Sequence, residues 1–309
     1  MKIFFTYIRT YFQADFKWAP HIAAAVFLAI TITLNYWFDW YDTVQDNYKF
    51  TLIYVFFLWC FYAFAFISGA LIVSFFKTEN KPIYNKKFIL FGLIGLALLS
   101  FDSSYYLLNF ADQFLSDNYF VLKWSRSLVS NLSSFVTVIV PLYIMYFLVN
   151  YFKPEFYGLR LNGARISNYF WLILFMIPLI YIASFRPDFL ETYPTYTDYY
   201  EYKFLQTEQW KTVGLYELCY GFDFISVELF FRGFLVVALS RFVGKDAILP
   251  MVIVYAFLHF GKPAGETISS IFGGYILGIL AFQSRNIFGG LIAHLGVAWG
   301  MEYFAYLQR

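Results

Sequence analysis

The sequence predicts an all-α protein, a polytopic transmembrane helical bundle of eight to nine spans. The first observation is composition, because 61% of the 309 residues are hydrophobic and only 14% are charged. An average soluble domain has roughly 45–50% apolar and roughly 25% charged residues. The second observation is that the apolar residues form long runs separated by short charged loops. The third is an aromatic content of 25%. A soluble globule of this size cannot bury that much apolar surface, so the chain is predicted to be an integral membrane protein.

Composition also excludes other classes of protein. Disorder requires low hydrophobicity and high net charge, and neither is present. Nucleic acid is not an expected partner, because the formal net charge is only +2 and no basic patch occurs. Cys60 and Cys219 both lie in apolar runs and are predicted to be packing residues rather than a disulfide.

The elements follow in chain order. The first twenty residues carry Lys2, Arg9 and Lys17 among aromatic residues and lack a signal-peptide cleavage site, so an amphipathic segment on the membrane surface is expected. A bilayer core of about 30 Å needs about 20 apolar residues in a helix. The third span is interrupted at Asp102 and the seventh and eighth are short, which leaves a count of eight or nine. The predicted spans are 21–38, 50–76, 88–108, 127–152, 168–185, 213–240, 247–260, 267–283 and 287–307.

Loop charges predict the orientation of the bundle. The N-terminal arm and the loops at 77–87, 153–165, 241–246 and 285 are net positive, whereas the loops at 39–49 and 186–212 are net negative. Positive loops stay in the cytoplasm. The N-terminus is therefore expected in the cytoplasm. The C-terminus is expected outside if there are nine spans and inside if there are eight.

The longest polar stretch divides the chain. Three parts are predicted: N-terminal transmembrane helices at 1–186, a Tyr-rich extramembrane loop at 187–212, and a C-terminal core at 213–309. An interfacial aromatic belt is the favoured interpretation of the loop, ahead of a ligand-binding cap. We find no internal repeat, which counts against an inverted-repeat transporter.

The span at 213–240 contains the charged residues Glu217, Asp223, Glu228 and Arg232. One charge at a helix centre costs about 2.5–3.5 kcal/mol, so these groups are expected to face a polar cavity or one another. Glu228 and Arg232 are four residues apart and can pair, either as a site or as a structural ion pair. Structural roles are expected for Glu217 and for Asp223, which points to another face.

Two of the three histidines, His259 and His294, lie in later spans, and together with the buried Glu–Arg pair they favour a functional site. Small residues recur every four positions in the last two spans, which predicts that the last four spans pack as one tight unit. These residues are Ser270, Gly274, Gly278, Gly296 and Gly300. No H-E-x-x-H zinc motif and no Gly-x-Gly-Asp or Gly-x-Ser-Gly element occurs.

Three motifs in this region resemble those of the CPBP family, the CAAX proteases and bacteriocin-processing enzymes. They are Glu228-x-x-x-Arg232-Gly233, Tyr255-x-x-x-His259, and His294 in a Gly-containing last helix. The resemblance covers about 213–307. It implies a bundle of about eight spans and the function of a membrane endopeptidase or a bacteriocin-immunity protein. The family motifs are E-E-x-x-x-R, F-x-x-x-H and H-x-x-x-N or H-x-x-x-D.

The chain departs from these motifs at three positions. Val227 replaces the first glutamate, which the family is thought to use with the second-motif histidine to activate water. Ala298 replaces the Asn or Asp that is thought to help hold the oxyanion, and Tyr255 replaces Phe. General-base help is typically worth 10²–10⁴-fold in rate and one oxyanion donor about 10²–10³-fold. Either Glu228 or Glu266 is expected to compensate, since a break at Gly261 and Pro263 can bring Glu266 toward the cavity.

The leading hypothesis is a glutamate-type membrane endopeptidase that cleaves a membrane-associated peptide or protein within the lipid bilayer. Glu228 or Glu266 deprotonates water, His259 orients the water, His294 donates to the oxyanion and Arg232 fixes Glu228. No cofactor is expected, and a zinc ion held by Glu228, His259 and His294 is an alternative. A family member without catalysis that acts by binding, in bacteriocin immunity or as a membrane scaffold, and a proton-coupled transporter are further alternatives. The resemblance and the loop charges point to the bacterial cytoplasmic (inner) membrane, and the oligomeric state is left open.

Overall fold

A computed structural model describes residues 2–149, 156–160, 169–197 and 200–309. It confirms the all-α class, because the structure is 83% helical and has no strand in these ranges. Four of the loop charges that predicted the orientation, Lys153, Glu155, Arg165 and Asp198, lie outside the described residues.

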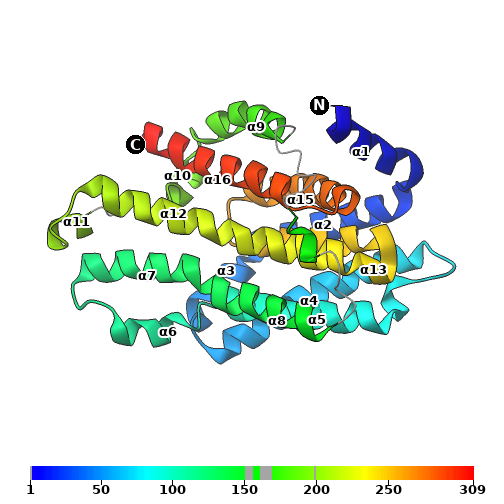
Figure 1. The fold of residues 1–309 in the computed structure, drawn as a ribbon, viewed down its shortest axis with the longest axis horizontal. Coiled ribbons are helices and arrows are strands. Elements are labelled where there is room, and N and C mark those ends of the chain that lie inside the picture. Colours follow the sequence, from blue (N-terminus) through cyan, green and yellow to red (C-terminus); the bar gives the residue numbers. More distant parts are fainter. Residues whose placement is uncertain (1, 150–155, 161–168, 198–199) are drawn as a thin grey trace.

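The part before the polar loop consists of helices of very different length (Figure 1). Polar caps begin several of them: the Thr51 hydroxyl accepts a hydrogen bond from the Tyr54 N–H, and the Asn85 side chain accepts one from the Phe88 N–H. A π-helical turn, Phe135–Ile139, joins α7 to α8. The helices are α1 (Lys2–Ala14), α2 (Trp18–Phe38), α3 (Trp40–Tyr48), α4 (Leu52–Phe75), α5 (Lys86–Ser103), α6 (Leu108–Ala111), α7 (Tyr119–Ser134), α8 (Val140–Leu148) and α9 (Phe170–Ala183).

The rest of the chain holds two short helices in the polar loop and the long helices of the C-terminal part. Helix α12 runs on without interruption into a π-helical segment, η7 (Leu229–Ala238), so the Glu228–Arg232 motif lies at the change of helix type. The elements are α10 (Pro187–Thr192), α11 (Glu201–Phe204), α12 (Gln209–Glu228), η7, α13 (Ser240–Val243), α14 (Ile248–Leu258), α15 (Ala264–Ser284) and α16 (Phe288–Gln308).

A helix occupies each of the nine segments in which a span was predicted. In the described part of the chain, four helical runs are long and apolar enough to cross a bilayer: Trp18–Phe38, Leu52–Phe75, Tyr119–Leu148 and Ala264–Ser284. A fifth is added if the bent pair Lys86–Ser103 and Leu108–Phe114 forms one broken span. The protein is thus an integral membrane helical bundle, and the count of eight to nine crossings stays a prediction.

Successive loops along the chain lie alternately at the two ends of the bundle. At one end Lys77 pairs with Asp246, Lys245 Nζ lies 2.8 Å from Asp15 Oδ1, and the Asn286 side chain donates to the Arg160 carbonyl. These contacts bring together the N-terminal arm and the loops predicted to be positive. At the other end the Tyr36 hydroxyl donates to the Lys262 carbonyl. The C-terminal Arg309 donates to the Leu190 carbonyl in the polar loop, so the two chain termini lie at opposite ends of the bundle.

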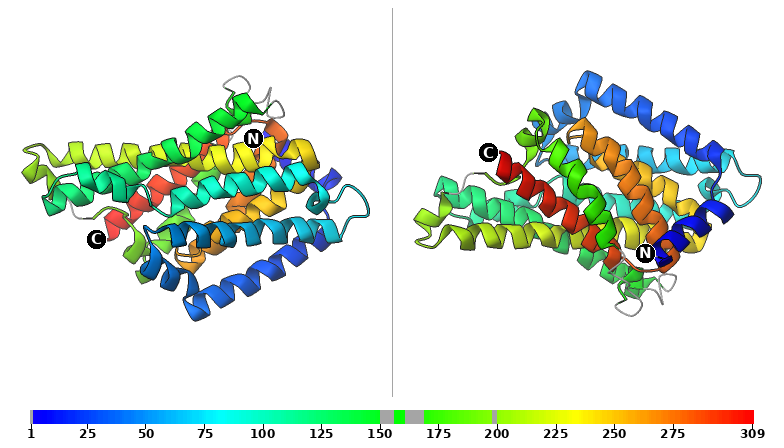
Figure 2. Two further views of the ribbon diagram at one scale, coloured as in Figure 1. Left: turned by 90° about the horizontal axis from the view of Figure 1, so that it is seen from below. Right: turned by 90° about the horizontal axis from the view of Figure 1, so that it is seen from above.

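Helix α14 is the centre of the hydrophobic core. Every residue from Ile248 to Phe257 is buried, and α4, α15 and η7 pack around the helix. A helix that is apolar on all sides is buried rather than exposed to solvent or lipid. Other helices of the bundle lie around this central position (Figure 2).

The small residues of the last two helices serve two different contacts. A Cβ at Gly274 would lie 2.9 Å from the Tyr255 ring, so the glycine lets α15 approach α14 as expected. A Cβ at Gly296 would lie 2.4 Å from Ile173 of α9 instead. The prediction that the last four spans form one unit is incomplete for α16, which contacts α12 and α15 but packs most extensively on α9 (Figure 1).

Candidate active site

The chain between α14 and α15 makes the break that Gly261 and Pro263 predicted. Helix α14 ends at Leu258 and α15 begins at Ala264. His259 therefore follows the last turn of one helix and Glu266 lies in the first turn of the next. The Thr267 hydroxyl donates to the His259 carbonyl over 2.5 Å, which ties the two helix ends together.

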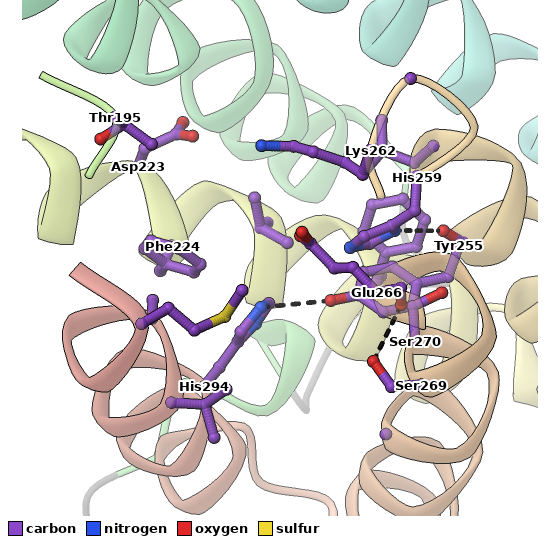
Figure 3. Close-up of a pocket in the computed structure, with 18 of the residues that line it drawn as sticks. Thr195, Asp223, Phe224, Tyr255, His259, Lys262, Glu266, Ser269, Ser270 and His294 are labelled. Carbon is purple, nitrogen blue, oxygen red and sulfur yellow. Dashed lines mark hydrogen bonds between the residues drawn. The ribbon is translucent and has the colours of Figure 1, made fainter. Parts of the chain in front are cut away.

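A cavity of about 1070 Å³ lies beside this break. Its wall combines residues from both halves of the chain, from α5 and α7 as well as from α9, α12, η7, α14, α15 and α16. Four of the five predicted site residues line it, as do all three positions that depart from the family motifs. The site residues are Arg232, His259, Glu266 and His294, and the departing positions are Val227, Tyr255 and Ala298. Figure 3 shows His259, Glu266, His294 and Tyr255 around the cavity.

The fifth predicted site residue, Glu228, lies behind the cavity wall. It is fully buried, and its Oε1 is 2.9 Å from His294 Nδ1 and 3.0 Å from Arg232 Nη1. A Cβ at position 290 would lie only 2.8 Å from Glu228 Oε2, so Gly290 makes room for this carboxylate. The arrangement supports His294 and Arg232 from behind and leaves no direct route from Glu228 to a molecule in the cavity.

Tyr255 links these groups to the cavity. Its hydroxyl lies 3.2 Å from His294 Nε2, and the Arg232 guanidinium carbon lies 4.3 Å from the centre of its ring. Because His294 Nδ1 faces a carboxylate, the proton of a neutral imidazole belongs on Nδ1, and Nε2 accepts the Tyr255 O–H. A cation above the ring is favourable in a desolvated site. None of the guanidinium nitrogens completes a hydrogen bond with a described residue.

His259 has one fixed nitrogen and one available nitrogen. Its Nδ1 lies 2.7 Å from the Tyr255 carbonyl oxygen, so Nδ1 carries the proton that it donates there. The unprotonated Nε2 is left as an acceptor in a side chain that lines the cavity. The centre of the Tyr255 ring lies 4.6 Å from the centre of the His259 imidazole, and this contact fixes the orientation of the imidazole (Figure 3).

Glu266 accepts hydrogen bonds from the polar loop. The Tyr193 hydroxyl lies 2.9 Å from Glu266 Oε1 and 3.0 Å from Oε2. Burial, followed by the nearby Glu266 carboxylate, raises the pKa of Tyr193 well above its ordinary value. The hydroxyl therefore stays protonated at neutral pH and donates to the carboxylate.

The polar loop is a cap on the cavity rather than an interfacial belt. Tyr193 and Tyr196 are 3% and 2% exposed, and the Thr195 N–H and hydroxyl donate to the buried Glu302 of α16. An interfacial tyrosine keeps its hydroxyl in the wet headgroup region, and these two do not. The belt interpretation was therefore wrong for Tyr193 and Tyr196, whose hydroxyls bond to the acidic side chains of Glu266 and Glu201 inside the protein. It stays a prediction for Tyr200, which is 50% exposed.

Asp223 lines the cavity whereas Glu228 does not, in keeping with the prediction that the two point to different faces of the helix. Tyr193 and Tyr255 were missed as site residues. The signal for Tyr255 was the substitution of the usual Phe, which adds one hydroxyl beside the motif histidine. Tyr193 had no such signal, because it is one of several tyrosines in the loop and only the tertiary fold selects it.

A metal centre receives no geometric support. In the ranges that the structure describes, no three or more His, Cys, Asp or Glu side chains are arranged to hold a metal ion. Glu228, His259 and His294 do not converge on one point, since Glu228 lies behind His294. Cys219 is buried, in keeping with the predicted packing role, whereas Cys60 is exposed and does not have that role.

Comparison with known proteins finds a family match over the segment that carries the three motifs. Residues 213–300 match the family described as Rce1-like, the type II CAAX prenyl endopeptidases. No curated protein and no solved structure gives a significant match to the chain. The matched segment includes Arg232, His259 and His294 and the helices that carry them. Over residues 213–300, less than a third of its length, the chain is similar to the Rce1-like type II CAAX prenyl endopeptidase family.

Proposed function

We propose that the protein is a membrane-embedded endopeptidase that uses Glu266 as its general base and cleaves a membrane-associated peptide or protein. The observation that carries the proposal is that Glu266, His259, His294 and Tyr255 line one cavity, whereas Glu228 does not. We place it in a bacterial cytoplasmic membrane with the N-terminus in the cytoplasm. The loop charges support that orientation.

In the proposed reaction, water enters between Glu266 and His259. One water hydrogen is accepted by His259 Nε2, and the Glu266 carboxylate takes the other as the water oxygen attacks the scissile carbonyl carbon. Glu266 then delivers this proton to the leaving nitrogen. The Tyr193 hydroxyl must leave Glu266 when water binds, so the cap is displaced in the productive state.

Tyr255 supplies the oxyanion donor that Ala298 lacks. When His294 carries a second proton, its Nε2–H donates to the Tyr255 oxygen and the Tyr255 O–H is free to point at the substrate oxygen. Glu228 stabilises the imidazolium through Nδ1–H. One oxyanion donor is worth about 10²–10³-fold in rate. A donor at Tyr255 would therefore replace the rate contribution that is lost because Ala298 has no polar side chain.

The test is cleavage of a membrane-peptide library by the purified protein in detergent. We expect Glu266→Gln and His259→Ala to lower kcat by at least about 10²-fold, the typical contribution of general-base help. Glu208→Gln is the matched control, since this glutamate is exposed outside the cavity and should leave kcat unchanged.

Two outcomes contradict the proposal. If Glu228→Gln abolishes cleavage while Glu266→Gln does not, the assignment of the base is wrong. If the folded protein cleaves no library member and gains activity on Val227→Glu, the chain is a degenerate protease that acts by binding, as in bacteriocin immunity or scaffolding.

A further inference from the structure

A second polar cluster lies on the cavity wall away from His259 and Glu266. We call it the acidic pocket and define it by Asp102, Thr137, Asp223, Ser226 and Tyr62, all but Thr137 of which line the cavity. The Thr137 hydroxyl donates to Asp102 Oδ1 over 2.5 Å. Ser226 Oγ is 3.3 Å from Asp223 Oδ1 and 2.7 Å from Ser134 Oγ. The two carboxylates belong to different halves of the chain, one to α5 and one to α12.

Among the described residues no salt bridge neutralises the carboxylates of this pocket, although Asp223 also interacts electrostatically with His294. They interact electrostatically with each other, and neither forms an ion pair with any side chain in the described ranges. The ammonium of Lys262, which also lines the cavity, lies 5.3 Å from the Tyr193 ring instead. Two carboxylates in a low-dielectric site without a counter-charge are unfavourable unless a proton or a cationic ligand neutralises the charge.

The surrounding tyrosines point to the same kind of ligand. Tyr41, Tyr62 and Tyr105 line this part of the cavity beside Asp102. Tyr62 is 0% exposed, and its hydroxyl has no hydrogen-bond partner among the described residues. A buried hydroxyl without a partner costs about 1–3 kcal/mol, so an acceptor lone pair is available here for a donor that the protein does not provide.

We propose that the acidic pocket binds a primary ammonium group, that of a lysine side chain or free N-terminus of the peptide substrate. An ammonium has three N–H donors, which match two carboxylates and one tyrosine hydroxyl. Tyrosine faces add a cation–π attraction. We assign the ammonium to a peptide because the acidic pocket and Glu266 line the same cavity, so one bound peptide can reach both. This assignment rests on the proposed function.

The test measures binding and needs no cleavage. The probes are dansylcadaverine, which ends in a primary ammonium, and the matched dansyl n-pentylamide, which does not. We expect the detergent-solubilised protein to bind the ammonium probe at least tenfold more tightly by dansyl fluorescence. Asp102→Asn and Asp223→Asn, singly and together, should remove that difference, with folding followed by thermal melting.

The matched control is Asp188→Asn, an acid on the same cavity wall that is already paired with Arg186 and should leave the difference intact. Equal affinity for the two probes, or a preference that survives both Asn substitutions, would overturn the ammonium site. Glu266→Gln should not alter probe binding, so a failure of the proposed catalysis is distinguishable from a failure of this site.

Competition identifies the source of the ammonium. A membrane peptide with one lysine should displace the probe at least tenfold better than its norleucine analogue. Displacement by lyso-phosphatidylethanolamine but not by the lysine peptide would overturn the peptide assignment in favour of a lipid headgroup.

Discussion

At the scale of single residues, the site depends on a side chain at one position and on the lack of a side chain at another. Tyr255 adds a hydroxyl where the family motif has Phe, and this hydroxyl meets His294 at 3.2 Å. Gly290 must lack a side chain, since a Cβ there would approach Glu228 Oε2 to 2.8 Å. One position supplies a donor and the other leaves space for the carboxylate that holds His294.

Replacing Tyr255 by Phe tests the donor. The aromatic ring under Arg232 is kept and only the hydroxyl is lost, so we expect an unchanged melting temperature and a fall in kcat of about 10²-fold. Tyr220→Phe is the control, because Tyr220 lines the same cavity on the far side of Phe224. Equal losses in both variants would mean that the Tyr255 hydroxyl has no specific part in the reaction.

Replacing Gly290 by Ala tests the space behind His294. Because Glu228 is fully buried and held by two partners, the added methyl group should destabilise the fold by about 1–3 kcal/mol, as overpacking does. Thermal melting measures the change. Gly273→Ala in α15 is the control: nothing lies within 4 Å of its Cβ position, so this substitution should stabilise by about 0.5–1 kcal/mol.

At the scale of elements, the break between α14 and α15 and the cap over the cavity determine what the site contains. The break puts Glu266 in the first turn of α15, where the N-terminal end of a helix favours a carboxylate. The cap is fastened at two points, by Tyr193 to Glu266 and by Thr195 to Glu302.

Glu302→Gln should loosen the cap. The Thr195 N–H donates to a buried carboxylate, and a hydrogen bond to a charged group is worth about 1.5–3 kcal/mol. Amide hydrogen exchange in the segment 193–197 should therefore speed up at least tenfold, while exchange in α14 stays the same. Glu191→Gln, an exposed acid in α10, is the control. Unchanged exchange in the Glu302 variant would show that the cap is held in another way.

At the scale of the whole molecule, the two ends of the bundle carry different loops. The ion pairs of Lys77 with Asp246 and Lys245 with Asp15 gather the N-terminal arm and two loops at one end. Both pairs are partly buried. Ion pairs at a protein surface contribute about 0–1 kcal/mol each, so these two mark the arrangement rather than create it. The packing of α4 and α15 on the buried α14 holds the bundle together.

Labelling of single cysteines tests the orientation. In a background with Cys60→Ala and Cys219→Ala, we expect Glu79→Cys to react only with a reagent that reaches the cytoplasmic face. Glu208→Cys should react from the outside. The reverse pattern would invert the bundle, and labelling of both from one side would contradict the alternation of loops between the two ends.

The sequence alone determined the class of this protein and the chemistry of its motifs. Apolar runs and helix-breaking residues are local properties, so composition predicted the helical membrane bundle, and Gly261 with Pro263 predicted the break before α15. The spacing of Glu228, Arg232, His259 and His294 identified the family region. Only the tertiary structure decided that Glu228 lies behind His294, that Tyr193 reaches Glu266, and that α16 packs on α9. Those contacts join segments that are far apart in the chain. Many similar aromatic and acidic residues could form each contact, and the local sequence does not indicate which of them does.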